Sequence, residues 1–206
     1  MIKVCGMRDA ENIRAVEALG VDMMGFIFWP KSCRYVVERP AYLPTKCKRV
    51  GVFVDEDIEQ VKRIADEYAL DFIQLHGHEN PDYCAQLKGM HLIKAISVSG
   101  RDDIATSKAY EGLVDYFLFD TKCPSVGGSG QQFDWSVLSA YDGDTPFLLS
   151  GGIGPHDAPR LRQAFALDGF PAEKCVGIDL NSRFESAPGL KDINKLKQFL
   201  EHYEQD

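Results

Sequence analysis

Short apolar runs alternate with helix-like segments along the whole 206-residue chain, and this alternation limits the folds available to it. Eight runs are brief and rich in β-branched or aromatic residues, as strands are. They are Ile2–Cys5, Asp22–Phe28, Val50–Val54, Phe72–Leu75, His91–Ile96, Tyr116–Phe119, Phe147–Leu149 and Val176–Ile178. Strands that alternate with helices form a parallel sheet, and eight such strands close into a barrel. The sequence therefore predicts an α/β fold, a single (β/α)8 TIM barrel domain over residues 1–206.

Helical spacing of apolar residues, with caps and stop signals, fills most of the intervals between these runs. The predicted helices are Asp9–Leu19, Asp55–Ala69, Pro81–Leu87, Asp102–Tyr110, one beginning near Asp134, one from Pro155, and Leu190–Tyr203. The interval 29–48 differs, because Pro40 and Pro44 leave little room for a regular helix. We expect a long loop there and a reduced or missing helix after the second strand.

Composition narrows the classes of function. Hydrophobic residues make up 45% and charged residues 26%, and the net charge of −8 argues against a nucleic-acid partner. A small anionic ligand remains compatible with that charge, because backbone amides can hold phosphate. The six cysteines form no C-x-x-C pair, there is no signal-peptide pattern, and no apolar run could span a membrane. We expect a cytoplasmic protein with free thiols and no membrane partner.

Residues just after the strands of a parallel barrel line a single mouth, where the active sites of such barrels lie. The chemically capable groups at these positions are Cys5, Arg34, His76, Asp120, Ser150 with Gly151 and Gly152, and Asp179 with Asn181 and Ser182. Asp120 also precedes a polar loop that contains Gly127, Gly128 and Gly130. A strand that delivers an acid to a glycine-rich loop is a common arrangement in catalytic sites.

Each of these groups also has an ordinary structural interpretation. Cys5 is compatible with a small buried hydrophobe, Arg34 with a solvated charge and Asp120 with a helix cap. His76 and His78 have no carboxylate at metal-ligand spacing, so we expect a polar lining residue and no metal. The turn beginning at Ser150 is either an ordinary connection or, with the segment 179–182, the phosphate site that barrels build from their last two loops.

Taken together, the motifs resemble the phosphoribosylanthranilate isomerase family over nearly the whole chain. The segments that carry the resemblance are Lys3–Met7, Gly25–Phe28, Lys31–Tyr35, Val50–Val54, Gln74–Gly77, Phe119–Lys122, Gly127–Gly130, Phe133–Trp135 and Leu149–Gly152. Their order and spacing make the match specific. It implies a (β/α)8 barrel that catalyses the Amadori rearrangement of N-(5-phosphoribosyl)anthranilate to 1-(2-carboxyphenylamino)-1-deoxy-D-ribulose 5-phosphate in tryptophan biosynthesis.

The resemblance also assigns roles. It implies that Cys5 is the general base, that Asp120 is the general acid and that Arg34 holds the anthranilate carboxylate. The glycine turns after the seventh and eighth strands would bind phosphate, and we expect the loop around Gly128 to order over bound substrate. An ordinary thiol titrates at about 8.5, close enough to neutrality to serve as a base. The rearrangement involves no redox step, so no cofactor is expected.

The sequence leaves alternatives for the role of Arg183 and for the function of the protein. Arg183 stands where the family often has a glycine, and it either adds charge near the phosphate or points to solvent. The rival functions are another phosphate-binding barrel, such as a sugar-phosphate epimerase or the histidine-pathway isomerase, and a silent barrel that binds a phosphorylated ligand or a partner protein. A cysteine at position 5 argues against the histidine-pathway enzyme, which looks to use two aspartates. The expected partner is a small phosphorylated substrate, and the expected assembly is a monomer or homodimer.

Overall fold

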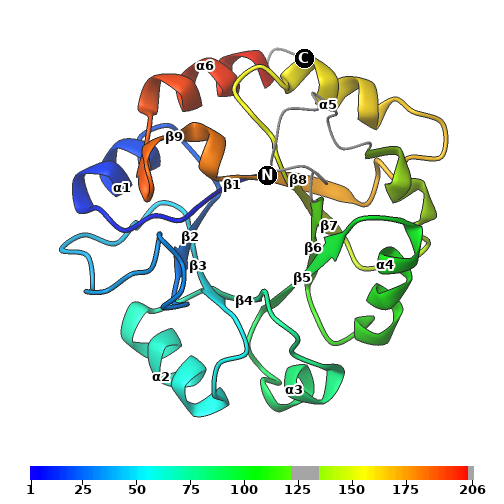
Figure 1. Ribbon diagram of the computed structural model, residues 1–206. Coiled ribbons are helices and arrows are strands. Elements are labelled where there is room, and N and C mark those ends of the chain that lie inside the picture. The colour runs from blue at the N-terminus through cyan, green and yellow to red at the C-terminus, as the bar shows by residue number, and fades with distance from the viewer. Residues whose placement is uncertain (122–134, 204–206) are drawn as a thin grey trace.

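Across residues 1–121 and 135–203, which the computed structural model describes, eight parallel strands form a closed barrel in sequential order (Figure 1). The strands are β1 Ile2–Cys5, β2 Met23–Ile27, β3 Lys48–Phe53, β4 Phe72–Leu75, β5 Leu92–Val98, β6 Tyr116–Thr121, β7 Phe147–Ser150 and β8 Cys175–Leu180. Pairing of β1 with β8 closes the barrel and sets Lys3 opposite Asp179. The prediction of a (β/α)8 barrel is confirmed.

Helices surround the strands on the outside of the barrel (Figure 1). The α-helices are α1 Ala10–Glu17, α2 Ile58–Tyr68, α3 Pro81–Gln86, α4 Arg101–Ala105, α5 Ala158–Phe165 and α6 Ile193–Tyr203. Short 3-10 helices supplement them at η1 Thr106–Tyr110, η2 Trp135–Ala140 and η3 Ser182–Phe184. Within the described residues, no helix is both long and apolar enough to cross a membrane.

Three helix predictions need correction. The helix expected from Pro155 begins at Ala158, with Pro159 in its first turn. The Gly154 amide donates a hydrogen bond to the Asp157 carboxylate, and this bond holds residues 154–157 in the preceding loop. The one expected near Asp134, itself outside the described residues, appears as the 3-10 helix η2. Leu190 does not start the last helix. It belongs to a small hairpin of β9 Glu185–Ala187 and β10 Leu190–Lys191, because these residues pair across a turn before α6 begins.

The interval between β2 and β3 contains no α-helix, as predicted. Tyr35 makes a parallel bridge with Ile27, and Val36 and Leu43 are buried against the barrel. The long loop thus covers the part of the barrel wall that a helix covers elsewhere. In Figure 1 it lies between α1 and α2.

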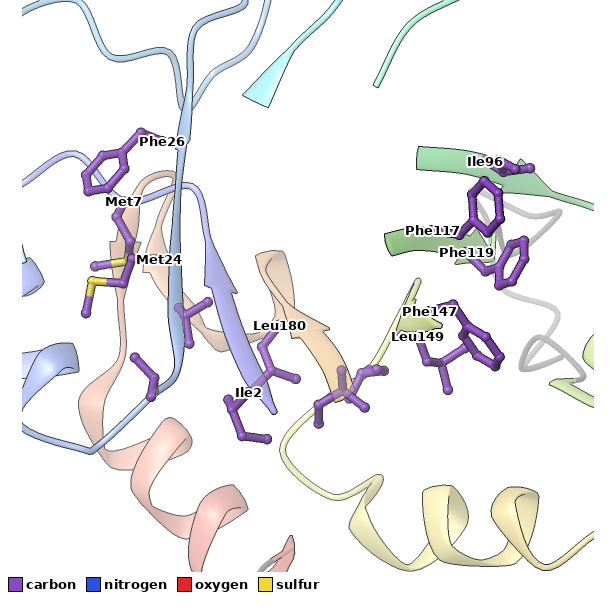
Figure 2. Close-up of a cluster of buried hydrophobic side chains, with 14 of the residues drawn as sticks. Ile2, Met7, Met24, Phe26, Ile96, Phe117, Phe119, Phe147, Leu149 and Leu180 are labelled. Carbon is purple, nitrogen blue, oxygen red and sulfur yellow. The ribbon is translucent and has the colours of Figure 1, made fainter. Parts of the chain in front are cut away.

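The apolar core has two layers because successive side chains of a strand point to opposite faces. The larger layer lies between strands and helices, and Figure 2 shows Phe117, Phe119, Phe147 and Leu149 pointing away from the barrel interior. The ring centroids of Phe119 and Phe147 are 5.0 Å apart in an edge-on arrangement. The smaller layer fills the barrel interior with Met23, Val50, Ile93, Ala95, Leu118 and Leu148.

The inward-facing positions become polar toward the carboxyl ends of the strands. Leu118 and Asp120 share the inward face of β6, and Leu148 and Ser150 share the inward face of β7. Asp120 and Ser150 are direct partners in the pairing of these two strands. One end of the barrel interior is therefore an apolar plug, and the other end presents polar groups to a single space.

The buried contact of α5 with the barrel gives a test of the outer layer. Leu161 is fully buried, whereas Leu167 just after the same helix is 46% exposed. We expect Leu161→Ala to lower the free energy of unfolding by about 2–5 kcal/mol because it leaves a cavity. Leu167→Ala, the matched control, should change it by less than about 0.5 kcal/mol. Urea unfolding followed by circular dichroism measures both, and equal effects would contradict this packing.

Candidate active site

A cavity of about 220 Å³ lies at the carboxyl ends of the strands. Its walls include most of the site residues expected from the sequence, namely Cys5, His76, Asp120, Ser150, Gly151, Gly152, Asp179, Asn181 and Ser182. Ile27, Val52, Gln74 and Ile153 complete the lining and were not anticipated. Their signal in the sequence is the period-2 alternation, which places Gln74 on the same face as His76. Gly128 lies outside the described residues.

Cys5 ends β1 with its side chain buried in the barrel interior. Its strand partner on β2 is Gly25, and a Cβ built on Gly25 would lie 2.6 Å from the Cys5 sulfur. Only a glycine at this position leaves room for the thiol. Burial raises the pKa of the Cys5 thiol, Lys3 opposes this, and the Asp179 carboxylate adds to it. The sequence did not reveal how deeply Cys5 is buried.

Beneath Cys5, a buried ion pair joins the first and last strands of the barrel. The Nζ atom of Lys3 lies 2.8 Å from Oδ1 of Asp179, and the Lys3 side chain has no exposed surface. Burial alone would lower the pKa of Lys3, but Asp179 and Cys5 raise it, so the lysine stays charged. Lys3 was not among the residues expected in the site, although a charged residue two positions before Cys5 within an apolar strand was the available signal.

Asp120, at the end of β6, faces His76 across the cavity. The Asp120 Oδ2 atom lies 3.5 Å from Nε2 of His76, and about a quarter of the Asp120 side chain is exposed, 26%. The Gln74 amide nitrogen lies 3.0 Å from Nδ1 of His76, and Oε1 of the same buried Gln74 has no hydrogen-bond partner within residues 1–121 and 135–203. With the Gln74 amide donating to Nδ1, the neutral imidazole carries its proton on Nε2, which faces the carboxylate.

Arg34 reaches the edge of this site from the loop after β2. Its Nε and Nη2 atoms donate to the two carboxylate oxygens of Glu185 at 2.8 and 2.7 Å. The side chain packs against Gly6, where a Cβ would lie 2.7 Å from Arg34 Cδ and 3.0 Å from Asn181 Oδ1. Gly6 has φ +80°, a conformation that suits glycine. Nη1 donates one proton to the Cys33 sulfur at 3.5 Å. One proton of Nη1 and one of Nη2 are left for another acceptor.

A buried lysine completes this arrangement. Lys191, on β10, places Nζ 2.7 Å from Oε1 of Glu185 and 2.9 Å from Oδ1 of Asn181. Burial by itself would raise the pKa of Glu185, but hydrogen bonds from Arg34 and Lys191 hold it below its ordinary value. Glu185 and Lys191 were not anticipated, because the hairpin that carries them has no distinctive pattern.

The turn after β7 supplies a site wall without side chains. Gly151 and Gly152 both have positive φ, 93° and 68°, which favours glycine at both positions. The amide of Gly154 donates to the Asp157 carboxylate at 2.7 Å, which fixes the path of the chain into α5. This geometry lets backbone approach a ligand closely, as the interpretation of the turn as an anion site requires.

A second, larger hollow of about 740 Å³ lies at the opposite end of the barrel. It is lined by the start of β3 and the end of α1, including Lys48, Arg49 and Glu17. Lys48 pairs with Asp71, and Arg49 donates to the backbone carbonyls of Pro44 and Tyr68. The Glu17 carboxylate accepts hydrogen bonds from Tyr42, Thr45 and Lys46. The chemically capable residues therefore gather in the smaller cavity.

A carboxylate and a thiol that face one cavity at the carboxyl ends of a closed parallel barrel define an enzyme of the (β/α)8-barrel class. A family model described as N-(5'phosphoribosyl)anthranilate (PRA) isomerase matches residues 2–202, and the chain belongs to this family. Its activity is the isomerisation of phosphoribosylanthranilate in tryptophan biosynthesis.

Curated relatives match nearly the whole chain. The chain is 52% identical to the N-(5'-phosphoribosyl)anthranilate isomerase of Phocaeicola vulgatus, over 96% of this chain and 98% of the relative. It is 48% identical to the Parabacteroides distasonis enzyme, with 98% and 92% covered. The crystal structure of the Thermotoga maritima isomerase superposes with a TM-score of 0.80 at 33% identity, over 98% and 97% of the two chains.

A further solved structure of the family contains a ligand. It is a phosphoribosylanthranilate isomerase in complex with reduced 1-(o-carboxyphenylamino)-1-deoxyribulose 5-phosphate. This chain resembles it with a TM-score of 0.78 at 30% identity, over 98% of this chain and 97% of that chain.

The tight packing of Cys5 against β2 yields a prediction. Gly25→Ala would push a methyl group to 2.6 Å from the thiol. We expect a loss of about 1–3 kcal/mol in the free energy of unfolding from overpacking, with a fall in kcat because the sulfur is displaced. Gly100→Ala is the control, since a Cβ there meets nothing within 4 Å. Unchanged stability and kcat in Gly25→Ala would show that the thiol has room to move.

Proposed function

We propose that Asp120 and Cys5 divide the rearrangement between them as acid and base. Asp120 protonates the ring oxygen of the ribose, the bond from that oxygen to C1 breaks, and an iminium ion forms. Cys5, as a thiolate, then removes the proton from C2, and the resulting enamine tautomerises to the ketone. The observation that carries this proposal is the single cavity lined by both residues, from β6 and β1. General acid–base steps of this kind contribute about 10²–10⁴-fold each.

The buried position of Cys5 fits the order of these steps. A thiol with a raised pKa is a stronger base once it has lost its proton, but a smaller fraction is ionised at neutral pH. Lys3 and Lys191 favour the thiolate, and both act against the effect of burial on the pKa of Cys5. The iminium ion formed in the first step adds a positive charge next to the sulfur at the moment when a base is needed.

Arg34 is proposed to bind the anthranilate carboxylate. Support comes from the hydrogen-bond pattern of its guanidinium. Glu185 occupies the Nε–Nη2 edge, and Nη1 donates one proton to the Cys33 sulfur, which leaves one proton on each of Nη1 and Nη2 for a second carboxylate. Because the Glu185–Lys191 pair is buried, the guanidinium is held before substrate arrives, which reduces the entropy lost on binding.

The phosphate group is proposed to bind at the turn Ser150, Gly151 and Gly152, with Ser182 from the loop after β8. The positive φ angles of the glycines and their place in the cavity wall support this assignment. His76, Asp179 and Asn181 would line the space between the two anionic ends. Gly128 keeps its predicted role in a loop over the substrate, outside the described residues.

A biosynthetic activity without redox chemistry supports the proposals of a cytoplasmic location and of catalysis without a metal or organic cofactor. A structure of this family described as monomers generated from the dimeric Thermotoga maritima isomerase is 30% identical to this chain. The proposed assembly for this chain is a monomer or a homodimer.

The acid and base assignments predict a characteristic pH dependence. Burial raises the pKa of the Cys5 thiol, so the thiolate fraction grows as the pH rises through neutrality. In Asp120→Asn the amide cannot supply a proton, and the activity that remains follows the ionisation of Cys5. We expect kcat about 10²–10⁴-fold lower, and residual kcat/KM that rises up to tenfold per pH unit as Cys5 ionises.

Loss of substrate fluorescence measures both profiles between pH 6.5 and 9. Cys5→Ser in the Asp120→Asn background is the control, and it should abolish the pH-dependent rise. A flat profile in Asp120→Asn would remove Cys5 from the role of base. Full activity in Asp120→Asn would remove Asp120 from the role of acid.

The proposed role of Arg34 predicts selectivity for a carboxylated ring. Arg34→Lys keeps the charge but loses the two-pronged geometry, so KM should rise about tenfold, equivalent to about 1.4 kcal/mol, with little change in kcat. Arg39→Lys, in the same loop but exposed, is the matched control. The preference for the product analogue over its decarboxylated form, measured as the ratio of their inhibition constants, should fall about tenfold in Arg34→Lys. If that ratio stays at the value of the parent, Arg34 does not hold the carboxylate.

A further inference from the structure

We propose that Arg183, on the loop after β8, binds the phosphate group of the substrate at the turn after β7. This assignment rests on the proposed placement of phosphate at Gly151 and Gly152, and it adds a side-chain ligand to that site. Arg183 belongs to η3, directly after Ser182 of the cavity wall. Its charge is thus carried by the loop after β8 and directed toward the loop after β7.

The position of the guanidinium follows from its distances to the glycine turn. Its Nη2 atom lies 3.8 Å from a Cβ built on Gly152, and Nη1 lies 3.7 Å from one built on Gly154. The Cδ atom of Arg183 lies 3.2 Å from the same Gly154 position, which is tighter than an ordinary contact. The side chain therefore runs along Gly154, and its charged end reaches Gly152 at the cavity wall.

Glycine at position 154 is what allows this approach. A side chain on Gly154 would press against the aliphatic part of Arg183, whereas a Cβ on Gly152 would lie in ordinary contact with the guanidinium at 3.8 Å. A strand-to-helix connection without such an approach would tolerate alanine at Gly154. Gly154 thus serves the close contact with Arg183, and Gly152, with φ 68°, serves the backbone path.

The guanidinium of Arg183 also has its hydrogen-bonding capacity available. Among residues 1–121 and 135–203, no carboxylate lies within ion-pair distance of Arg183, whereas Glu185 engages two nitrogens of Arg34. The neighbouring carboxylate, Asp157, accepts a bond from the Gly154 amide at 2.7 Å and lies 3.9 Å from Arg160. Arg183 is therefore placed to meet an external anion.

Phosphate is the anion that this geometry suits. A guanidinium offers parallel N–H donors that match two oxygens of a phosphate group, and charge-assisted bonds of this kind are roughly twice as strong as neutral ones. The protein carries a net charge of −8, so a local cation at the phosphate end offsets repulsion of a dianion. Arg34 and Arg183 then serve the two anionic ends of one substrate.

Arg183→Ala tests this inference, with Arg183→Lys as a partial replacement and Arg63→Ala, exposed on α2, as the control. The probes are inorganic phosphate for one end of the site and anthranilate for the other. We expect the dissociation constant of inorganic phosphate, measured by calorimetry, and the KM of substrate to rise about tenfold in Arg183→Ala. The dissociation constant of anthranilate, kcat and the unfolding midpoint should stay unchanged. The phosphate dissociation constant and KM of Arg183→Lys should lie between those of the parent and of Arg183→Ala.

Phosphate affinity and KM within twofold of the parent in Arg183→Ala would overturn the inference. So would an equal loss of anthranilate affinity, because a general disturbance of the site moves both constants. If phosphate fails to compete with substrate in the parent, the proposed phosphate position is wrong and the role of Arg183 falls with it. If the parent does not turn over substrate, the proposed mechanism fails, while the calorimetric comparison still decides whether Arg183 binds phosphate.

Discussion

The buried ion pair between Lys3 and Asp179 joins barrel closure to the chemistry of the site. Both charges lie inside the barrel, where burial is costly unless the partners are close and bonded, and their 2.8 Å separation satisfies that condition. The same pair sits beside Cys5, and its two members act in opposite directions on the pKa of that thiol. A change in how β1 meets β8 would therefore alter barrel closure and the thiol together.

The two ends of the site are built on different principles. At one end, Lys191, Glu185 and Arg34 form a continuous chain of charge-assisted bonds that fixes one guanidinium before any ligand is present. At the other end, the Gly151–Gly152 turn lets backbone approach a ligand closely. Arg183, the inferred side-chain ligand, is exposed and has no carboxylate partner among the described residues. The first arrangement favours selection of a carboxylate of fixed geometry. The second suits a phosphate, which has several equivalent oxygens.

Much of the fold was predictable because it depends on local patterns. Strand runs with β-forming residues and intervening amphipathic segments predicted the barrel, and Pro40 and Pro44 predicted the loop that replaces a helix after β2. Boundaries that depend on tertiary contacts were less accessible. Helix α5 begins at Ala158 and not at Pro155, and Leu190 lies in a hairpin and not in the last helix. In both places hydrogen bonds to other residues outweigh the local helix preference.

The sequence alone determined which groups reach the mouth of the barrel, since strand order and period-2 alternation place Cys5 and Asp120 at strand ends. Only the tertiary structure decided their environment. The raised pKa of Cys5 comes from burial and from charges at Lys3 and Asp179, and Asp179 lies 174 residues away from Cys5 along the chain. Electrostatic effects depend on distance in space and on exclusion of water, and neither quantity is encoded in local sequence pattern.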